Sequence, residues 1–130
     1  LIGVLFETLE VLDDCVPRRG AMNMAIDEAL LLFVQKPTLR FYRWKARTVS
    51  FGYFGRVADA VEFAAGREIV RRWTGGGMVP HGEDLTYSII VPAHENGFGL
   101  TASDFYQRVH LALSAALAPG RLCAGSARLV

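Results

Sequence analysis

The residues best suited to chemistry lie in one short segment, residues 71–81. Arg71 and Arg72 are followed there by three consecutive glycines, residues 75–77. A run of glycines costs conformational entropy, which indicates a need for unusual dihedral angles or close backbone approach. The amides of such a loop can form a concave site for a phosphate or carboxylate, and a guanidinium can hold the same anion. A plain glycine-rich hairpin with solvated arginines would also explain the segment.

The flanking residues narrow these alternatives without settling them. Arg71 and Arg72 are adjacent in a predicted strand and so point to opposite faces, and we expect only one of them to reach the loop. No P-loop or dinucleotide-binding motif is present. His81, His94 and His110 lack metal-ligand spacing, so we expect no metal site, but His81 borders the glycines and remains a candidate. A Ser-His-Asp triad cannot be recognised from chain order alone, because it is defined by geometry.

The elements that must position this loop follow from the apolar periodicity. The pattern predicts strands over residues 4–11, 39–44, 48–53, 69–73 and 85–91, and helices over 21–35, 57–65 and 101–117. Residues 13–20 are expected to be a turn-rich connection, and residues 45–47 could close a hairpin. Strands and helices mix without strict alternation, which favours an α/β or α+β fold with helices packed on a sheet. No linker divides residues 1–130, so we expect a single domain.

Composition excludes several classes of function. Hydrophobic residues make up 52% of the chain, which excludes intrinsic disorder, and a net charge of +1 does not suggest a nucleic-acid partner. The apolar runs are too short to span a membrane, and no signal peptide opens the chain, so no membrane association is expected. The two cysteines, Cys15 and Cys123, are too few for a disulfide scaffold. We therefore expect reduced thiols and a cytoplasmic location.

Four blocks in the chain are similar to a known family. They are residues 23–31 (NMAIDEALL), 39–44 with 48–54, the loop 71–81 (RRWTGGGMVPH) and 84–88 (DLTYS). In this order they resemble the lipoate–protein ligase, octanoyltransferase and biotin–protein ligase superfamily, and most closely its lipoate ligase-like branch. The resemblance implies a central mixed sheet flanked by helices, as in a biotin/lipoate ligase-like catalytic domain that is incomplete in this chain.

The resemblance also implies a chemistry. Lipoate ligases activate a lipoyl carboxylate with ATP and Mg²⁺ and pass the acyl group to a lysine on a lipoyl carrier domain. The residues that would hold the acyl-adenylate are Arg72, Gly75, Gly76, Gly77, Val79 and His81. Those that would line a pocket for lipoate or octanoate are Trp44, Gly52 and Tyr53, although core packing would equally explain Trp44 and Tyr53.

The tail departs from the family pattern. Residues 120–127 (GRLCAGSA) resemble a segment in which the family usually carries a lysine that contacts the carboxyl or phosphate oxygens. The position of that lysine corresponds to Leu122, or to Arg121 if the alignment is shifted by one residue, so the catalytic residue stays unassigned. A coincidental Ala/Gly/Ser-rich stretch is the alternative. The segment also arrives early, and we expect stretches near residues 119–120 and after 130 to be missing.

Three functions remain open at this point. The first is a lipoate ligase-like enzyme that uses ATP. The second is an acyltransferase that takes octanoyl from a carrier-protein thioester through a cysteine thiolate, for which Cys123 is the only nearby candidate although a buried structural cysteine fits it better. The third is a relative that binds an acyl or vitamin-like ligand without turnover, as the missing lysine would favour.

Overall fold

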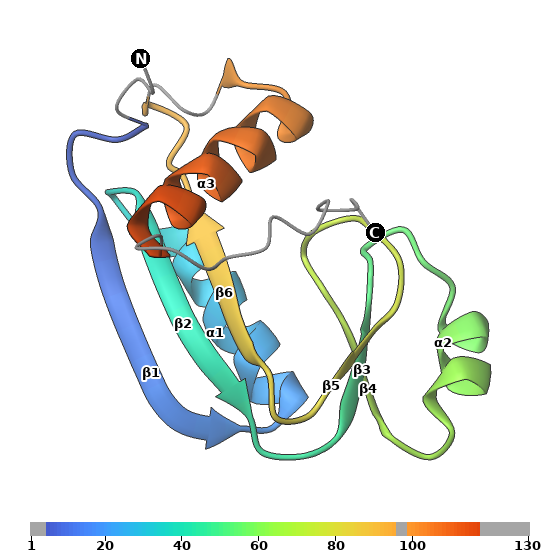
Figure 1. Ribbon diagram of the computed structural model, residues 1–130. Coiled ribbons are helices and arrows are strands. Elements are labelled where there is room, and N and C mark those ends of the chain that lie inside the picture. The colour runs from blue at the N-terminus through green and yellow to red at the C-terminus, as the bar shows by residue number, and fades with distance from the viewer. Residues whose placement is uncertain (1–4, 96–98, 118–130) are drawn as a thin grey trace.

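The computed structural model describes residues 5–95 and 99–117 of the 130-residue chain (Figure 1). In chain order the elements are β1 (Glu10–Arg18), α1 (Gly20–Phe33), β2 (Thr38–Trp44), β3 (Thr48–Phe51), α2 (Val57–Ala64), β4 (Glu68–Arg71), β5 (Val79–His81), β6 (Leu85–Ile90) and α3 (Ala102–Leu117). The mixed α/β class expected from the sequence is confirmed. The strands form two small sheets rather than one.

The first sheet has the strand order β1-β2-β6. β1 runs parallel to β2, and β2 runs antiparallel to β6, with Phe41 opposite Tyr87. The prediction of a strand at residues 4–11 and a turn-rich connection at 13–20 is wrong, because β1 extends from Glu10 through that connection. Acidic residues and a proline lower the strand propensity there. Pairing with β2, in which Asp14 lies opposite Tyr42, compensates for this low strand propensity. An ion pair between Asp14 and Arg18, within β1, also balances the charge of that carboxylate.

The second sheet has the order β4-β3-β5, with β3 parallel to β4 and antiparallel to β5. All four residues of β3 are buried. The hairpin considered between residues 39–44 and 48–53 is wrong, because β2 and β3 belong to different sheets. The amide of Lys45 donates to the carbonyl of Arg18, and the amide of Glu68 donates to that of Arg47. These bonds hold the connection from β2 to β3, in which the chain passes from the first sheet to the second.

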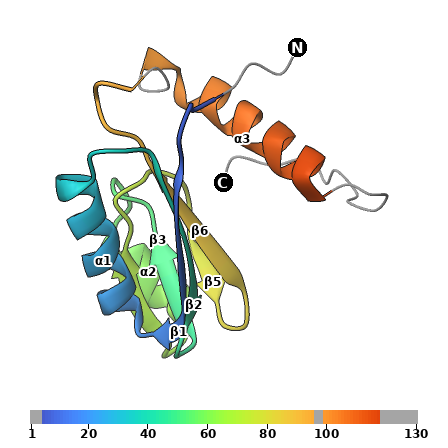
Figure 2. The same cartoon turned by 90° about the vertical axis from the view of Figure 1, so that its left-hand side faces the viewer.

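The helices cover the sheets as the periodicity predicts, with ends that differ by one or two residues. Figure 2 shows α1 and α3 on opposite sides of the first sheet. Gly20, the first residue of α1, lies so close to the second sheet that an added Cβ would come within 2.9 Å of side-chain carbons of Thr48 and Val70. α1 therefore joins the two sheets at a point where only glycine fits without a shift.

A buried arginine ties three elements together. The side chain of Arg40, in β2, is only 1% exposed. It forms ion pairs of 2.8 Å with Asp14 of β1 and with Asp27 of α1, and it donates to the side-chain oxygen of Asn23. A buried charge is tolerated only when it is paired and hydrogen-bonded in this way. The cluster thus fixes α1 and β1 against β2.

Candidate functional site

The glycine loop connects β4 to β5 and is held in place by Arg72. One guanidinium nitrogen of Arg72 donates to the hydroxyl of Ser50 at 2.9 Å. The other donates to the carbonyls of Gly75 at 3.1 Å and Gly77 at 2.9 Å. Burial of the guanidinium lowers the pKa of Arg72 from its ordinary value, because desolvation disfavours the charged form. The arginine therefore anchors the loop to the middle of β3.

Arg71 points away from the loop. Its guanidinium donates to the carbonyl of Gly55 at 2.8 Å and lies 4.5 Å from the centre of the Phe51 ring. The alternation expected of a strand is confirmed: of the two arginines, only Arg72 bonds to carbonyls of the loop glycines, residues 75–77. Arg71 instead orders the turn that follows β3.

The loop packs directly on Gly52, the residue after β3. A Cβ added at Gly52 would lie 2.1 Å from the carbonyl oxygen of Gly76, well inside contact distance. Gly76 itself has a φ of 96°, a conformation that favours glycine. Among the described residues, the amides of the three loop glycines have no hydrogen-bond acceptor, while two of the carbonyls are bound to Arg72. These amides can receive an anion or an acyl oxygen.

A row of hydrogen bonds extends from the arginine through a histidine. Nε2 of His81 lies 2.7 Å from the Ser50 hydroxyl, and its Nδ1 lies 2.8 Å from a carboxylate oxygen of Asp84. Because Arg72 can only donate to Ser50, the serine proton is available to Nε2 of His81. In the neutral imidazole this arrangement places the ring proton on Nδ1, facing Asp84.

An aromatic ring also packs against the imidazole of His81. The Trp44 ring stacks on the His81 ring with 4.0 Å between centroids and 15° between planes. The indole N–H of Trp44 donates to the hydroxyl of Thr86 at 2.8 Å, and that hydroxyl lies 3.0 Å from Asp84. Burial opposes ionisation of Asp84, but the hydrogen bonds from His81, the Gly82 amide and Thr86 outweigh it and hold the pKa of Asp84 below its ordinary 3.8.

A cavity of about 500 Å³ opens at the free edge of β6. Apolar side chains supply most of its wall, including Met24 from α1 and Phe105 and Val109 from α3. Arg72 and Thr74, at the start of the glycine loop, line the same cavity. Its volume falls within the range of about 300–1,000 Å³ typical of small-molecule sites. An apolar chain can therefore lie between the helices with its polar end at the loop.

Asp27 is a polar residue of the cavity wall that the sequence analysis did not single out. Its carboxylate pairs with Arg40 and accepts hydrogen bonds from Ser88 at 2.8 Å and from the Tyr42 hydroxyl at 3.3 Å. Burial and the charge of Asp27 together raise the pKa of Tyr42 above its ordinary value. These bonds orient the Asp27 carboxylate toward Arg40, Ser88 and Tyr42. The ion pair with Arg40 balances its negative charge beside the cavity.

The residues predicted to form an acyl pocket occupy different surroundings. Trp44 is buried against His81, Gly52 supports the glycine loop, and Tyr53 is 45% exposed. None of them is among the residues that line the cavity at β6. Of the residues predicted to hold the acyl-adenylate, Arg72 lines that cavity, whereas Gly75, Gly76, Gly77, Val79 and His81 do not. Val79 lies in β5 opposite Ser50. The roles predicted for these residues stay predictions.

The candidate catalytic residues of the tail, Arg121 and Leu122, lie outside the described residues, as does Cys123. Cys15 is exposed on β1, and a hydrogen bond from its thiol to the carboxylate of Asp13 raises its pKa. A thiol with a raised pKa is a poor nucleophile at neutral pH. Cys15 therefore does not have the environment of a reactive cysteine.

The described residues do not offer a ready Mg²⁺ site. No cluster of three or more His, Cys, Asp or Glu side chains occurs within residues 5–95 and 99–117. The carboxylates nearest the cavity and the histidine, Asp27 and Asp84, are committed to Arg40 and His81. Within the same residues, no helix has the length and apolar character required to cross a bilayer.

Together, the mixed sheets, the arginine-anchored glycine loop and the adjacent apolar cavity define a mixed α/β domain with one candidate binding site. The family model of the lipoyl protein ligase A/B catalytic domain matches residues 19–124. The chain belongs to this family.

Curated relatives are named octanoyltransferase LipM. The protein from Exiguobacterium sibiricum is 45% identical over 95 residues, which cover 67% of this chain and 34% of the relative. The protein from Carboxydothermus hydrogenoformans is 47% identical over 92 residues, covering 65% and 34% of the two chains. The chain thus spans about a third of the length of these relatives.

Solved structures give a similar result. A T. acidophilum protein provisionally described as a lipoate protein ligase aligns with a TM-score of 0.51 and 35% identity, covering 62% of this chain and 36% of that one. A second structure of that protein, with bound lipoic acid, aligns with the same TM-score and 38% identity.

Proposed function

We propose that the intact protein transfers an eight-carbon acyl group, octanoyl, from a carrier-protein thioester to a lysine of a lipoyl carrier domain. The relatives named octanoyltransferase LipM support transfer over ATP-dependent ligation, one of the three functions that the sequence leaves open. The observation that carries the proposal is the cavity at β6, where an apolar wall ends at Arg72 and Thr74. The site offers an apolar slot and a polar end, which an acyl group requires.

The described residues would contribute binding and polarisation of the carbonyl. The acyl chain would lie between α1 and α3, and the amides of residues 75–77 would donate to the carbonyl oxygen as negative charge develops on it. Fixed donors of this kind are worth about 2.7–4 kcal/mol each in acyl transfer. Arg72 would act mainly by holding the loop, since its nitrogens already bond to Ser50 and to two loop carbonyls. His81 would act through Ser50 on the same anchor.

The chemical balance of transfer needs no nucleotide. When the lysine nitrogen attacks the thioester carbonyl directly, the C–S bond to the carrier breaks and the carrier thiolate takes up the proton that the nitrogen loses. When a cysteine thiolate attacks first, the carrier thiolate leaves and an acyl-cysteine forms; the lysine nitrogen then attacks this second thioester, the cysteine thiolate is released, and the carrier thiolate takes up the proton that the nitrogen loses. No described cysteine has a suitable environment, so Cys123 or a residue beyond this chain would supply the thiolate.

ATP-dependent lipoate ligation is the second candidate. It is favoured by one observation, the lipoic acid bound in the T. acidophilum relative. In that case the loop amides, Arg72 and His81 would hold the acyl-adenylate.

The intact gene product distinguishes the candidates. Transfer of octanoyl from its carrier protein to a lipoyl domain without ATP supports the proposal, whereas lipoate-dependent exchange between ATP and pyrophosphate supports the ligase. Saturable octanoate or lipoate binding with neither reaction refutes both and leaves a binding protein. Arg72→Ala should lower acyl transfer and acyl binding while the far-ultraviolet spectrum stays unchanged, and Arg72→Lys should restore only part of the loss, because lysine lacks the forked donors.

A further inference from the structure

One aromatic residue at the polar end of the acyl cavity has no part in the proposed transfer. Trp73 stands between Arg72 and Thr74 in the chain, and all three line the cavity at β6. Trp73 is 43% exposed, so a large part of its indole is open to a ligand. Since Arg72 and Thr74 mark the polar end, the first carbons of an acyl chain would pass beside this indole.

Hydrogen bonds hold Trp73 from two sides. The amide of the preceding residue, Arg72, donates to the carbonyl of Phe51, the last residue of β3, at 2.9 Å. The indole N–H of Trp73 donates to the carbonyl of Met24, in α1, at 3.2 Å. The residue therefore bridges the second sheet and α1, and its side chain cannot swing away from the cavity without giving up the bond to α1.

Tyr53 supports the indole from outside the cavity. Its amide donates to the carbonyl of Thr74 at 2.8 Å, which fixes the chain just after Trp73. The two aromatic rings lie with 6.0 Å between centroids and 31° between planes, within the range of favourable aromatic pairs. Tyr53 is not among the residues that line the cavity. The indole is thus backed by a second ring that leaves the cavity itself open.

The wall that α3 contributes is less firmly held. α3 supplies Phe105, Tyr106 and Val109 to the cavity, and Val109 is the only buried residue of that helix. A segment with few buried apolar contacts yields more easily than a closely packed one. The width of the cavity is therefore fixed beside Trp73 and adjustable on the side of α3.

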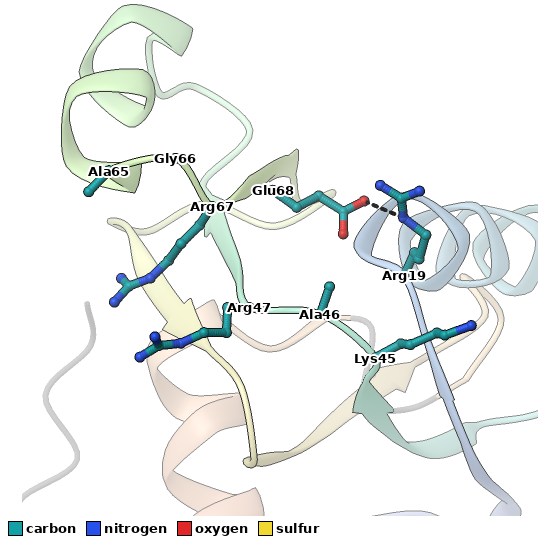
Figure 3. A pocket seen from close by; sticks show the side chains of 8 residues that line it. All are labelled: Arg19, Lys45, Ala46, Arg47, Ala65, Gly66, Arg67 and Glu68. Carbon is teal, nitrogen blue, oxygen red and sulfur yellow. Dashed lines mark ion pairs between the residues drawn. The ribbon is translucent and has the colours of Figure 1, made fainter.

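A second hollow, of about 870 Å³, lies at the junction between the two sheets and offers no alternative place for acyl selection (Figure 3). Its charged lining residues are Arg19, Lys45, Arg47, Arg67 and Glu68. An apolar chain placed there would remove water from charged groups without replacing it, which is unfavourable. The hollow shares no lining residue with the cavity at β6, so discrimination between acyl groups is left to that cavity.

We propose that Trp73 determines acyl specificity by admitting chains that are unbranched next to the carbonyl. The inference rests on the proposed function, since it takes the acyl carbonyl to lie at the glycine loop with its chain in the cavity. A methyl branch on the third carbon would meet the fixed indole, whereas a branch near the far end of the chain would meet a wall that can yield. One methyl group misplaced in an apolar pocket lowers kcat/KM by about 10–200-fold.

The test uses two isomeric acyl groups on the same carrier protein, 3-methyloctanoyl and 7-methyloctanoyl, which differ only in the place of the branch. The intact wild-type protein is compared with Trp73→Ala and Trp73→Phe. Two further variants serve as controls. Phe54→Ala removes an aromatic ring that is 89% exposed and does not line the cavity, and Val109→Ala enlarges the cavity on the side of α3.

Wild type should transfer the 7-methyl isomer with a kcat/KM at least about 10-fold higher than that of the 3-methyl isomer. Trp73→Ala should bring this ratio to within about threefold, and Trp73→Phe should give an intermediate ratio because a smaller ring remains. Phe54→Ala and Val109→Ala should keep the wild-type ratio. The ratio compares two substrates on one enzyme, so a general loss of activity in a variant cancels. If Trp73→Ala does not fold, Trp73→Phe alone decides.

Several outcomes would overturn the inference. Equal transfer of the two isomers by the wild type is one, and an unchanged ratio in the Trp73 variants is another. An equal loss of selectivity in Val109→Ala would show that total cavity volume, and not Trp73, selects the branch position. If the wild type transfers no acyl group, the proposed function fails, and calorimetric binding of 3-methyloctanoate and 7-methyloctanoate to the same variants decides the question of specificity. Failure to bind either acid would then refute the inference as well.

Discussion

Replacing Gly52 by alanine tests whether the position of the glycine loop is set by contact with β3. The added Cβ would lie 2.1 Å from the carbonyl oxygen of Gly76 and 2.9 Å from the carbonyl carbon of Gly75. Both neighbours are backbone atoms, so no side-chain rotation can relieve the clash. The loop must move by about 1 Å or more to reach van der Waals contact, and overpacking of this kind costs about 1–3 kcal/mol.

The same loop offers a matched control in Gly75→Ala. A Cβ on Gly75 would have no heavy atom within 4 Å, and the residue has no positive φ. This variant should be neutral or more stable by about 0.4–1 kcal/mol, because alanine restricts the unfolded chain. Urea unfolding of the intact protein measures both changes as shifts of the transition midpoint.

The functional consequence should follow the structural one. A displacement of about 1 Å in the donors of an acyl oxygen can lower the rate by about 100-fold. Gly52→Ala should therefore slow octanoyl transfer strongly, and Gly75→Ala should do so much less. Equal midpoints and equal rates for the two variants would refute the reasoning that the loop is held by its contact with Gly52.

Further changes test the anchor, the buried cluster, the histidine row and the acyl slot. Ser50→Ala should lower the free energy of unfolding in urea by about 1–3 kcal/mol, because it leaves polar groups of Arg72 without a partner. It should slow octanoyl transfer by only about 10-fold, whereas loss of a nucleophile would slow the reaction by about 1,000-fold or more. Arg40→Met should destabilise by about 3–5 kcal/mol in the same assay, since two carboxylates lose their buried cation. The lowered pKa of Asp84 means that its contribution to stability is complete above about pH 4 and is lost as the pH falls through that lowered value; Asp84→Asn should abolish this part of the acid dependence in thermal unfolding measured from pH 2 to 6. Shortening the acyl group from eight to six carbons should weaken binding by about 1.6 kcal/mol, or about 15-fold by calorimetry, if the chain is buried in the apolar cavity.

Periodicity and glycine content predicted the parts of the fold that depend on local sequence. All three helices and the loop at residues 75–77 lie where the pattern places them. β1 could not be predicted in the same way, because its pairing with β2 outweighs the poor strand propensity of its acidic residues and Pro17. β5 is only three residues long, too short for its alternation to be distinguished from a loop.

The polar clusters depend on tertiary contacts that no spacing reveals. Arg40 occupies a position where a strand pattern allows either a solvated arginine or a buried one, and only its meeting with Asp14 and Asp27 decides between them. Ser50 was part of a predicted strand with no role of its own. Its place between His81 and Arg72 requires β5 to pair with β3, which the sequence analysis did not anticipate.

The row Ser50–His81–Asp84 has the distances of a nucleophile, a base and a carboxylate, but its surroundings give it a different role. Ser50 is fully buried, so an acyl carbonyl cannot reach its oxygen. That oxygen also accepts a hydrogen bond from the Arg72 guanidinium, which lowers its electron density and occupies one of its two lone pairs. The row is therefore a structural chain of hydrogen bonds that connects His81, at the end of β5, to Arg72, the arginine that holds the glycine loop. His81 and Arg72 are not hydrogen-bonded to each other, yet each depends on the hydroxyl of Ser50 that lies between them.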